Sequence, residues 1–352
     1  KKIKALNFKS INVDLNLLSQ LNIDDSAIAF TEGFILGNYT FSDLKTDKNP
    51  NESIQHISFI STDKSISKKT AVAAINAEAQ NTARYLANLP GNLLTPALFV
   101  KQIKSILSNK AFKIKVYNSN ELQKKGMNAL YNVGKGSENP PYLVEIKLNI
   151  SKTKKPAILV GKGVTFDAGG ISLKPSKGMG DMKADMSGAA AVVGALKALS
   201  DQKSSCSVIG LIPLAENMPS GSAYRPGDVI TSYSGKSIEI TNTDAEGRLI
   251  MADALAYATE YKPKVIIDIA TLTGAACVAL GELSAALFGN QQKTIDTFLT
   301  YVHQTGEQFW QLPLFDDYLN YLKSDSADLI NASESRTSGG AITAAKFLEQ
   351  FV

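Results

Sequence analysis

The sequence predicts an α/β fold, in which a mixed, largely parallel sheet carries helices on both faces and joins a smaller α+β domain at the N-terminus. Short apolar runs alternate with stretches of helical periodicity, which is the pattern of strands joined by crossover helices. The runs are continuously apolar, as expected for strands buried on both faces. The composition, 44% hydrophobic and 20% charged among 352 residues, is that of a globular protein with one large domain and a smaller one.

The N-terminal part is expected to form a partial, small α+β domain over residues 1–68. This stretch is polar and rich in Asn, Asp and Lys, and the segment TDKNPNES (46–53) interrupts it. A connecting helix is predicted at residues 69–88, where an alanine-rich stretch has helical periodicity and ends before Pro90. Residues 89–352 then form the main domain.

The main domain is predicted to alternate helices and strands. Amphipathic or alanine-rich periodicity predicts the helices, and β-branched apolar runs predict the strands. The predicted helices are residues 96–107, 119–130, 186–199 and 250–261, and the predicted strands are residues 112–118, 142–150, 156–161, 206–215, 237–240 and 264–272. In such folds ligands bind at the carboxyl ends of strands, so polar residues just after positions 161 and 240 are candidates for a functional site.

The composition disfavours several classes of function. The net charge is +4 with basic and acidic residues mixed, which indicates neither a nucleic-acid-binding stripe nor a membrane-binding surface. No apolar run reaches membrane-spanning length and no secretory signal opens the chain, so a cytoplasmic protein is expected. Cys206 and Cys277 lie in apolar settings without a CxxC motif, and we expect both to be buried small side chains in a reducing compartment.

The two histidines restrict the kinds of catalytic and metal-binding site that the chain can form. His56 and His303 have no metal-ligand pattern around them and are expected to be surface or half-buried structural residues. A zinc site of the HExxH type is thereby excluded, and a Ser-His-Asp triad is disfavoured because only two histidines are available to it. Any bound metal would be held mainly by oxygen ligands.

The segment NTDAEGRL (242–249) is the first candidate site. It connects the predicted strand at 237–240 to the following helix and places Asp244, Glu246 and Arg248 two residues apart. In an extended chain that spacing puts all three side chains on one side. Acids near a helix start also cap free N–H groups and complement the helix dipole, so this segment alone leaves a purely structural role open.

A second candidate site lies in the glycine-rich stretch at residues 160–196. Lys162, Asp167, Lys174 and Asp185 stand there among glycines that let a backbone approach a ligand closely. The GKG in this stretch suggests a phosphate loop, but neither GxxxxGK[ST] nor GxGxxG is present. Asp185 could instead cap the following helix, and Lys162 could be a solvated turn lysine.

Taken together, Asp167, Asp185, Asp244 and Glu246 bring four carboxylates from strand ends or loops. Carboxylates that converge without cations repel one another, and their pKa values rise. Two divalent cations would balance the four negative charges, and bridging carboxylates suit a two-metal hydrolytic site. Oxygen-rich ligation accommodates Mn²⁺ and Mg²⁺ as well as Zn²⁺. Peptide, phosphoester and other hydrolysis all remain open at this point.

The motifs NTDAEGRL, VGKGVTFDAGGISLK and MKADMSGAA together closely resemble the cytosolic leucine aminopeptidases, a family of two-metal exopeptidases. The similarity extends to NLPGNLLTP, IATLTGA and GGAITAAKFLEQFV, and so covers about residues 88–352. It implies a catalytic domain at 89–352 that removes the N-terminal residue, preferably leucine or another apolar residue, from peptides with a free N-terminus. The family's FDSGG reads FDAGG here, which places Ala168 outside the ligand set.

The resemblance also implies the ligands of two divalent metal ions, Mn²⁺ or Zn²⁺ and possibly Mg²⁺, with a water or hydroxide bridging them as the nucleophile. Asp167 and Glu246 would bridge the two metals. Lys162 and Asp185 would complete the tighter site, and Asp244 would belong to the more exchangeable one. A ligating lysine must be neutral, which nearby dications allow because they lower its pKa.

Further roles follow from the same resemblance. Lys174 matches the lysine that polarises the scissile carbonyl, and Arg248 matches the arginine that holds a bicarbonate ion as general base. Met182, Thr271 and Gly274 match positions that line the pocket for the substrate side chain, although ordinary core packing would also explain them.

Family members assemble as homohexamers, and a hexamer is implied here by the resemblance alone. Relatives also continue past the match to Val352 into a segment that helps line the pocket, so we expect a C-terminal segment to be missing from this sequence. Two alternatives are a two-metal phosphoesterase and an inactive or DNA-binding relative. The complete motif set disfavours the first, and the modest net charge without a basic stripe disfavours the second.

Overall fold

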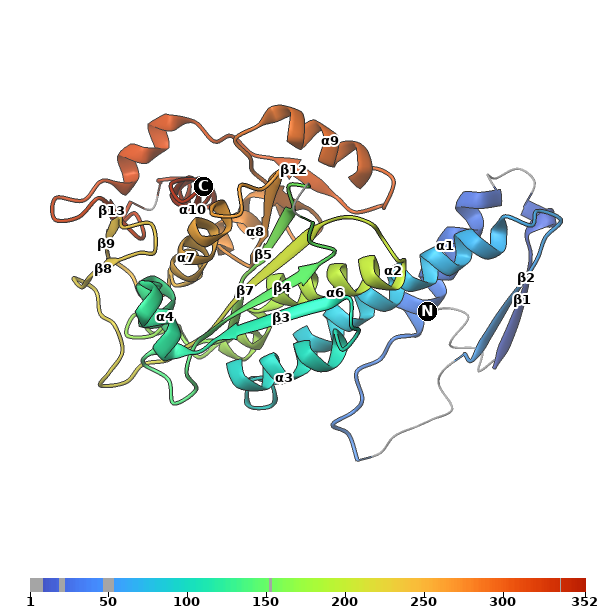
Figure 1. The fold of residues 1–352 in the computed structure, drawn as a ribbon, viewed down its shortest axis with the longest axis horizontal. Helices are drawn as coiled ribbons and strands as arrows, with labels where there is room; N and C mark the ends of the chain where they lie inside the picture. Colours follow the sequence, from blue (N-terminus) through green and yellow to red (C-terminus); the bar gives the residue numbers. More distant parts are fainter. Residues whose placement is uncertain (1–8, 19–22, 47–53, 152–153, 336) are drawn as a thin grey trace.

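The computed structural model describes residues 9–18, 23–46, 54–151, 154–335 and 337–352. Its centre is a six-stranded sheet with the order β10-β5-β7-β4-β3, in which β6 also pairs with β7 (Figure 1). The strands are β3 Phe112–Tyr117, β4 Tyr142–Leu148, β5 Ala157–Gly161, β6 Gly163–Asp167, β7 Val208–Asn217 and β10 Val265–Ile269. β10, β5, β7 and β6 pair in parallel, whereas β4 is antiparallel to both β7 and β3. This confirms the mixed, largely parallel sheet predicted from the sequence.

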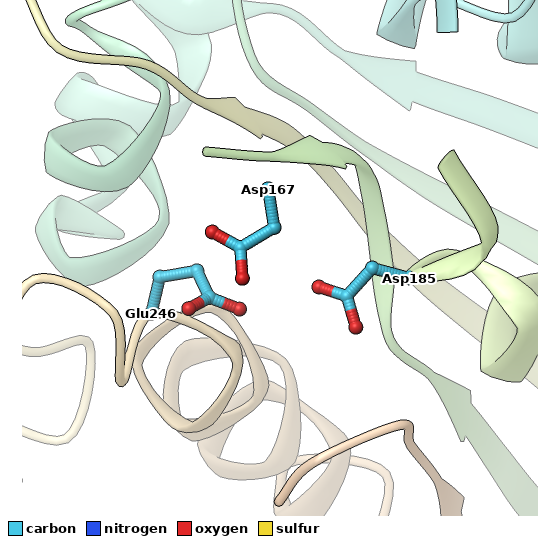
Figure 2. Close-up of side chains that lie close together, drawn as sticks. All are labelled: Asp167, Asp185 and Glu246. Atoms are coloured by element: carbon cyan, nitrogen blue, oxygen red, sulfur yellow. The ribbon is translucent and has the colours of Figure 1, made fainter. Parts of the chain in front are cut away.

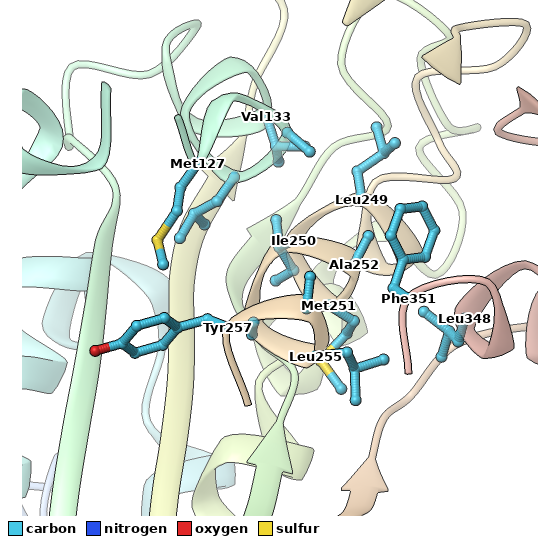
Figure 3. Close-up of a cluster of buried hydrophobic side chains, with 14 of the residues drawn as sticks. Met127, Val133, Leu249, Ile250, Met251, Ala252, Leu255, Tyr257, Leu348 and Phe351 are labelled. Atoms are coloured by element: carbon cyan, nitrogen blue, oxygen red, sulfur yellow. The ribbon is translucent and has the colours of Figure 1, made fainter. Parts of the chain in front are cut away.

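Helices cover both faces of the sheet because successive strand residues point to opposite sides. In β4, for example, Leu143 is buried on one face and Val144 on the other. The helices are α2 Ile66–Asn88, α3 Pro96–Ile106 and α6 Ser187–Asp201 on the face of Val144, and α5 Asn128–Gly134, α7 Gly247–Thr259 and α10 Gly340–Glu349 on the face of Leu143. Figure 3 shows the apolar side chains of α7 packing between those of α5 and those at the end of α10.

Smaller elements surround this core. They are α4 Ser119–Lys125, β8 Val229–Thr231, β9 Ser237–Glu239, α8 Gly274–Leu280, β11 Ala285–Leu287, α9 Gln292–Val302, β12 Phe309–Gln311 and β13 Leu329–Ile330. β13, β9 and β8 form a separate three-stranded sheet, and β11 pairs with β12. Across the ranges that the structure describes, no helix is both long and apolar enough to cross a membrane.

The N-terminal part contains both strand and helix. β1 Ser10–Asp14 pairs in parallel with β2 His56–Ile60, and α1 Ile23–Asn38 lies between them in the sequence. The long helix α2 packs against α1 and against α6, and so ties this part to the main body (Figure 1). Residues 47–53 of the predicted interruption lie outside the described residues. The division at residues 68 and 88 stays a prediction, although α2 begins at Ile66.

Three expectations are corrected by the structure. The helix predicted at 119–130 is two helices, because Gly126 adopts a left-handed conformation with φ 79° and ends α4. The structure also contains a strand that was not predicted, since β6 follows β5 after a single intervening residue and pairs with β7. The strand at 237–240 belongs to the small sheet with β8 and β13 and not to the main sheet. Cys206 and Cys277 are exposed, since one lies in the loop before β7 and the other on the outer side of α8.

Asp253 anchors the middle of α7 and gives the fold a testable pH dependence. Its buried carboxylate accepts the backbone N–H groups of Leu130 (2.9 Å) and Tyr233 (2.8 Å). Burial raises the pKa of Asp253 to about 7, from an ordinary value near 4. Between these two values the folded chain binds more protons at this group than the unfolded chain does, so the stability that Asp253 contributes falls as the pH rises.

We therefore expect the advantage in unfolding free energy of wild type over Asp253→Asn to shrink by about 2 kcal/mol between pH 5 and pH 7, and to level off above about pH 8. Urea unfolding of both proteins across this range measures the difference. Comparing the two proteins cancels the titration of all other carboxylates. An advantage that is constant or grows with pH would contradict the raised pKa.

Candidate metal centre

Three parts of the chain that are distant in the sequence meet near the carboxyl ends of β5 and β6. Lys162 is the single residue between β5 and β6, and Asp167 is the last residue of β6. Asp185 follows a short 3-10 helix at Met179–Ala184, just before α6. Glu246 directly precedes α7. Lys162 and Asp167 thus lie at strand ends as predicted, whereas Asp185 and Glu246 lie just before helices.

Three carboxylates form the centre of the site. Asp167, Asp185 and Glu246 are buried, and each offers a carboxylate oxygen that lies within 4.8 Å of those of the other two. Figure 2 shows the three groups pointing toward one another from different elements. Burial raises the pKa of both Asp185 and Glu246, because the charged forms lose hydration. Such a trio is stable only with cations close by.

Lys162 provides one of those cations. Its side chain is 3% exposed, and its Nζ lies 2.7 Å from Asp185 Oδ2 and 2.9 Å from Glu246 Oε1. Nζ also donates to the carbonyl of Thr271 at 2.9 Å. Burial by itself would lower the pKa of Lys162, but Glu246 and Asp185 outweigh burial and raise it. Lys162 is thus no solvated turn lysine.

Lys174 and Asp244 form the outer part of the site. Lys174 Nζ lies 2.9 Å from Asp167 Oδ2 and forms an ion pair with Asp244 Oδ1. Both side chains are partly exposed, so solvent reaches this side. Burial is the main cause that raises the pKa of Asp244, and the two carboxylates raise that of Lys174 against the effect of its own burial. Asp244 lies outside the buried trio, next to it.

Arg248 is buried in the first turn of α7, and its guanidinium contacts Asn331 and not the carboxylate trio. Its guanidinium donates to the main-chain carbonyl of Asn331 at 2.8 Å. Within the described part of the chain, no carboxylate lies within ion-pair distance of Arg248. Burial lowers the pKa of Arg248 to about 10, which leaves it charged at neutral pH. A buried cation without a carboxylate partner is a place where a small anion would be stabilised.

The helix-capping role that the sequence left open for Asp185 and Glu246 is not what the structure shows. Neither Asp185 nor Glu246 caps the helix that follows, since α6 and α7 have no side-chain cap hydrogen bond. The spacing argument for residues 244, 246 and 248 is also wrong, because this segment is a bend followed by a helix and not an extended strand. The three side chains consequently have different partners: Lys174, Lys162 and the Asn331 carbonyl.

Of the expected pocket residues, Thr271 contacts the site. Met182 is half-buried, and Thr271 and Gly274 are exposed, so core packing does not explain the last two. The hydroxyl of Thr271 donates to Asp185 Oδ1 at 2.6 Å, in addition to the bond that its carbonyl accepts from Lys162. Thr271 therefore supports the metal-site residues directly, and its role in a substrate pocket stays a prediction.

Sequence reasoning missed a layer of polar residues behind the carboxylates. Asn217, the last residue of β7, donates from Nδ2 to Asp167 Oδ1 (2.9 Å) and to the Thr243 carbonyl (3.0 Å). Tyr224 donates to the same carbonyl at 2.7 Å. Asn217, Tyr224 and Thr243 are all buried. Asn217 follows an apolar run just as Asp167 does, and that shared position is the signal that could have identified it.

The residues present fit a divalent metal. Four carboxylates face only two ammonium groups, those of Lys162 and Lys174, so the cluster carries an excess of negative charge. Asp185 Oδ2 and Asp244 Oδ1 are buried oxygens whose partners among the described residues are the ammonium groups of Lys162 and Lys174, with no further hydrogen-bond donor. Oxygen donors in excess of the available protons and cations are the donor set that hard and borderline dications require.

A buried carboxylate cluster of this kind in an α/β domain is compatible with a metal-dependent hydrolase, and the comparisons with known proteins show the family. The catalytic-domain model of the cytosol aminopeptidase family matches residues 81–352. The chain belongs to the cytosol aminopeptidase family, and it is thus a metal-dependent aminopeptidase by class. A two-metal phosphoesterase is not favoured by this membership.

Individual relatives agree with the family. A probable cytosol aminopeptidase of Sulfurihydrogenibium sp. (strain YO3AOP1) is 43% identical over 355 residues, which cover 100% of this chain and 70% of the relative. One from Geobacter sp. (strain M21) is 45% identical over 325 residues, covering 91% of this chain and 66% of the relative. The chain thus spans about two thirds of the length of these relatives.

Solved structures give the same result. The bottromycin maturation enzyme BotP in complex with Mn superposes with a TM-score of 0.89 at 37% identity, covering 98% of this chain and 74% of that one. The cytosol aminopeptidase of Coxiella burnetii superposes with a TM-score of 0.86 at 37% identity, covering 94% of this chain and 69% of that one. At these identities the likeness extends beyond the fold to the family.

Proposed function

We propose that this chain removes the N-terminal residue, preferably leucine or another apolar residue, from peptides at a site that holds two divalent metal ions. The observation that carries the proposal is the buried trio Asp167, Asp185 and Glu246, with carboxylate oxygens within 4.8 Å of one another. Lys162 and Asp244 are the further proposed ligands, and Asp167 and Glu246 are the proposed bridging ligands. Mn²⁺ is a good candidate, since the BotP structure that this chain resembles contains it.

Lys162 and Lys174 would then have different roles in the reaction. When bound, the metal ions would supply Lewis-acid chemistry and a water nucleophile at neutral pH. Lys162 would become a neutral ligand, because dications on Asp185 and Glu246 remove the negative field that now raises its pKa. Lys174, the partly exposed cation at the outer side, would hydrogen-bond the scissile carbonyl and stabilise the oxyanion that develops there.

Arg248 is proposed to hold a bicarbonate ion that accepts the proton of the attacking water. The support is its burial, together with the lack of a carboxylate partner within the described residues, which leaves donors of the guanidinium for an anion. Met182, Thr271 and Gly274 are proposed to line the pocket for the first side chain of the substrate. Assembly as a homohexamer and a cytoplasmic location are further proposals, and light scattering with size-exclusion chromatography tests the first.

The direct test compares a leucine-initiated peptide with its N-acetylated form. We expect release of leucine from the free-amine peptide only, loss of release after dialysis against a chelator, and recovery on addition of Mn²⁺ or Zn²⁺. A peptide with aspartate in the first position serves as the control for side-chain preference and should react slowly. Turnover of the acetylated peptide, or full activity in chelator, would contradict the proposal.

A further inference from the structure

One buried asparagine outside the proposed ligand set holds the segment that carries the proposed ligand Asp244 and directly precedes the proposed ligand Glu246. We infer that Asn331 is a positioning residue that fixes residues 241–245, and with them Asp244, Glu246 and Arg248. The inference rests on the proposed metal site. Asn331 follows β13, far along the chain from that segment, and it is fully buried with 0% exposure.

Both ends of the Asn331 side chain contact the main chain of this segment. Its Oδ1 accepts from the N–H groups of Thr241 at 2.8 Å and Asn242 at 3.3 Å. Its Nδ2 donates to the carbonyls of Asn242 at 2.7 Å and Ala245 at 3.4 Å. The amide thus spans the segment from its first residue to its last, and it contacts none of the proposed ligand side chains.

The main chain of Asn331 also contacts the residues that precede and follow this segment. Its N–H donates to the carbonyl of Glu239 in β9 at 2.9 Å, and its carbonyl accepts from the guanidinium of Arg248 at 2.8 Å. A single residue therefore links the strand before the segment, the segment itself and the arginine after it. A shift of Asn331 would move Asp244, Glu246 and Arg248 together.

The segment needs such a partner for a physical reason. Residues 241–245 form a bend and turn between β9 and α7, so most of their N–H and C=O groups lack partners in a ladder or helix. Buried groups of this kind must be satisfied by side chains, and a side-chain amide offers donors and acceptors at once. Asn217 and Tyr224 donate to the Thr243 carbonyl, and the Ser172 hydroxyl accepts from the Thr243 N–H at 3.1 Å. Among the described residues, the Asn331 side chain makes more hydrogen bonds to the main chain of this segment than any other side chain.

The consequence is a preorganised pair of ligands. Partners behind a metal ligand fix its orientation, and their loss typically costs about 10- to 100-fold in metal affinity. We expect Asn331→Asp, which keeps the size and the acceptor but loses the Nδ2 donor, to weaken Mn²⁺ binding by about 10-fold. Asn331→Ala, which loses both, should weaken it more. The kcat for a leucine-initiated peptide should fall in the same order, with a smaller change in KM.

The experiment is a Mn²⁺ titration of the purified full chain, followed by the electron paramagnetic resonance signal of free Mn²⁺. The matched control is Leu122→Ala, which removes a fully buried side chain of α4 outside the site. It should lower the thermal unfolding temperature at least as much as Asn331→Asp does, yet bind Mn²⁺ like wild type. Circular dichroism measures the folded fraction of each protein.

The outcomes separate the inference from the proposed function. If wild type binds no Mn²⁺, the proposed metal site fails. If wild type binds Mn²⁺ and both Asn331 variants bind it equally well, the positioning role is overturned. A parallel loss of Mn²⁺ affinity in Leu122→Ala, or failure of both Asn331 variants to fold, would assign Asn331 to general stability and would also overturn it.

Discussion

Replacement of Glu246 by glutamine is expected to lower aminopeptidase activity by roughly 10³-fold or more, because metal-ion catalysis supplies several kcal/mol of transition-state stabilisation. Glu246 belongs to the buried trio and also contacts Lys162 at 2.9 Å. Glutamine keeps the size but removes a negative charge that the proposed metals require. Kinetics with a leucine-initiated peptide measures the activity, and elemental analysis after dialysis measures the metal content.

Glu145→Gln is the matched control for this change. Glu145 is an equally buried glutamate, in β4, and its carboxylate accepts from the hydroxyls of Tyr257 (2.8 Å) and Tyr261 (2.7 Å) far from the strand ends. We expect this variant to lose stability but to keep metal content and kcat. Full activity of Glu246→Gln, or equal metal loss in both variants, would show that Glu246 is no ligand.

Gly188→Ala should have the largest effect on the fold. Gly188 lies in the first turn of α6, where a Cβ would stand 2.0 Å from the carbonyl oxygen of Ile269 and 3.0 Å from the N of Lys162. Both contacts are backbone, so no side-chain rotation relieves them. We expect a loss of roughly 3 kcal/mol or more in unfolding free energy, at the upper end of overpacking costs.

Urea or thermal unfolding measures this loss, and Gly221→Ala is the control, since nothing lies within 4 Å of its added Cβ. That control should change stability by less than about 1 kcal/mol. Because α6 begins two residues after Asp185, we also expect Gly188→Ala to disturb the proposed metal site if the protein folds. A fully stable Gly188→Ala protein would mean that α6 and β10 are farther apart than described.

Much of the fold was predictable because its signals are local. The apolar run at 206–215 and the periodicity of the alanine-rich helices report burial within a few residues, and β7, α2 and α6 lie where these patterns indicated. The errors arose where local signals are weak or ambiguous. The glycine at 126 can continue or end a helix, and a three-residue strand such as β9 pairs with whichever edge the tertiary fold offers.

For the candidate site, the sequence alone identified the acids and lysines, and the family resemblance suggested a role for each. The structure brings Lys162, Asp167, Asp185 and Glu246 into contact distance, with Lys174 and Asp244 beside them. Their ligand roles stay predictions.

Most strands and helices of the core, the charged residues of the candidate site and the family could be recognised from the sequence, whereas β6 and α10 could not. The polar residues that support the site became visible only in the folded chain. Asn217 and Asn331 act through hydrogen bonds to segments distant in the sequence, and whether an asparagine meets such a partner depends on how strands are ordered and how loops pack. Local propensity carries no information about a partner that lies elsewhere in the chain, and so these contacts could be seen only in three dimensions.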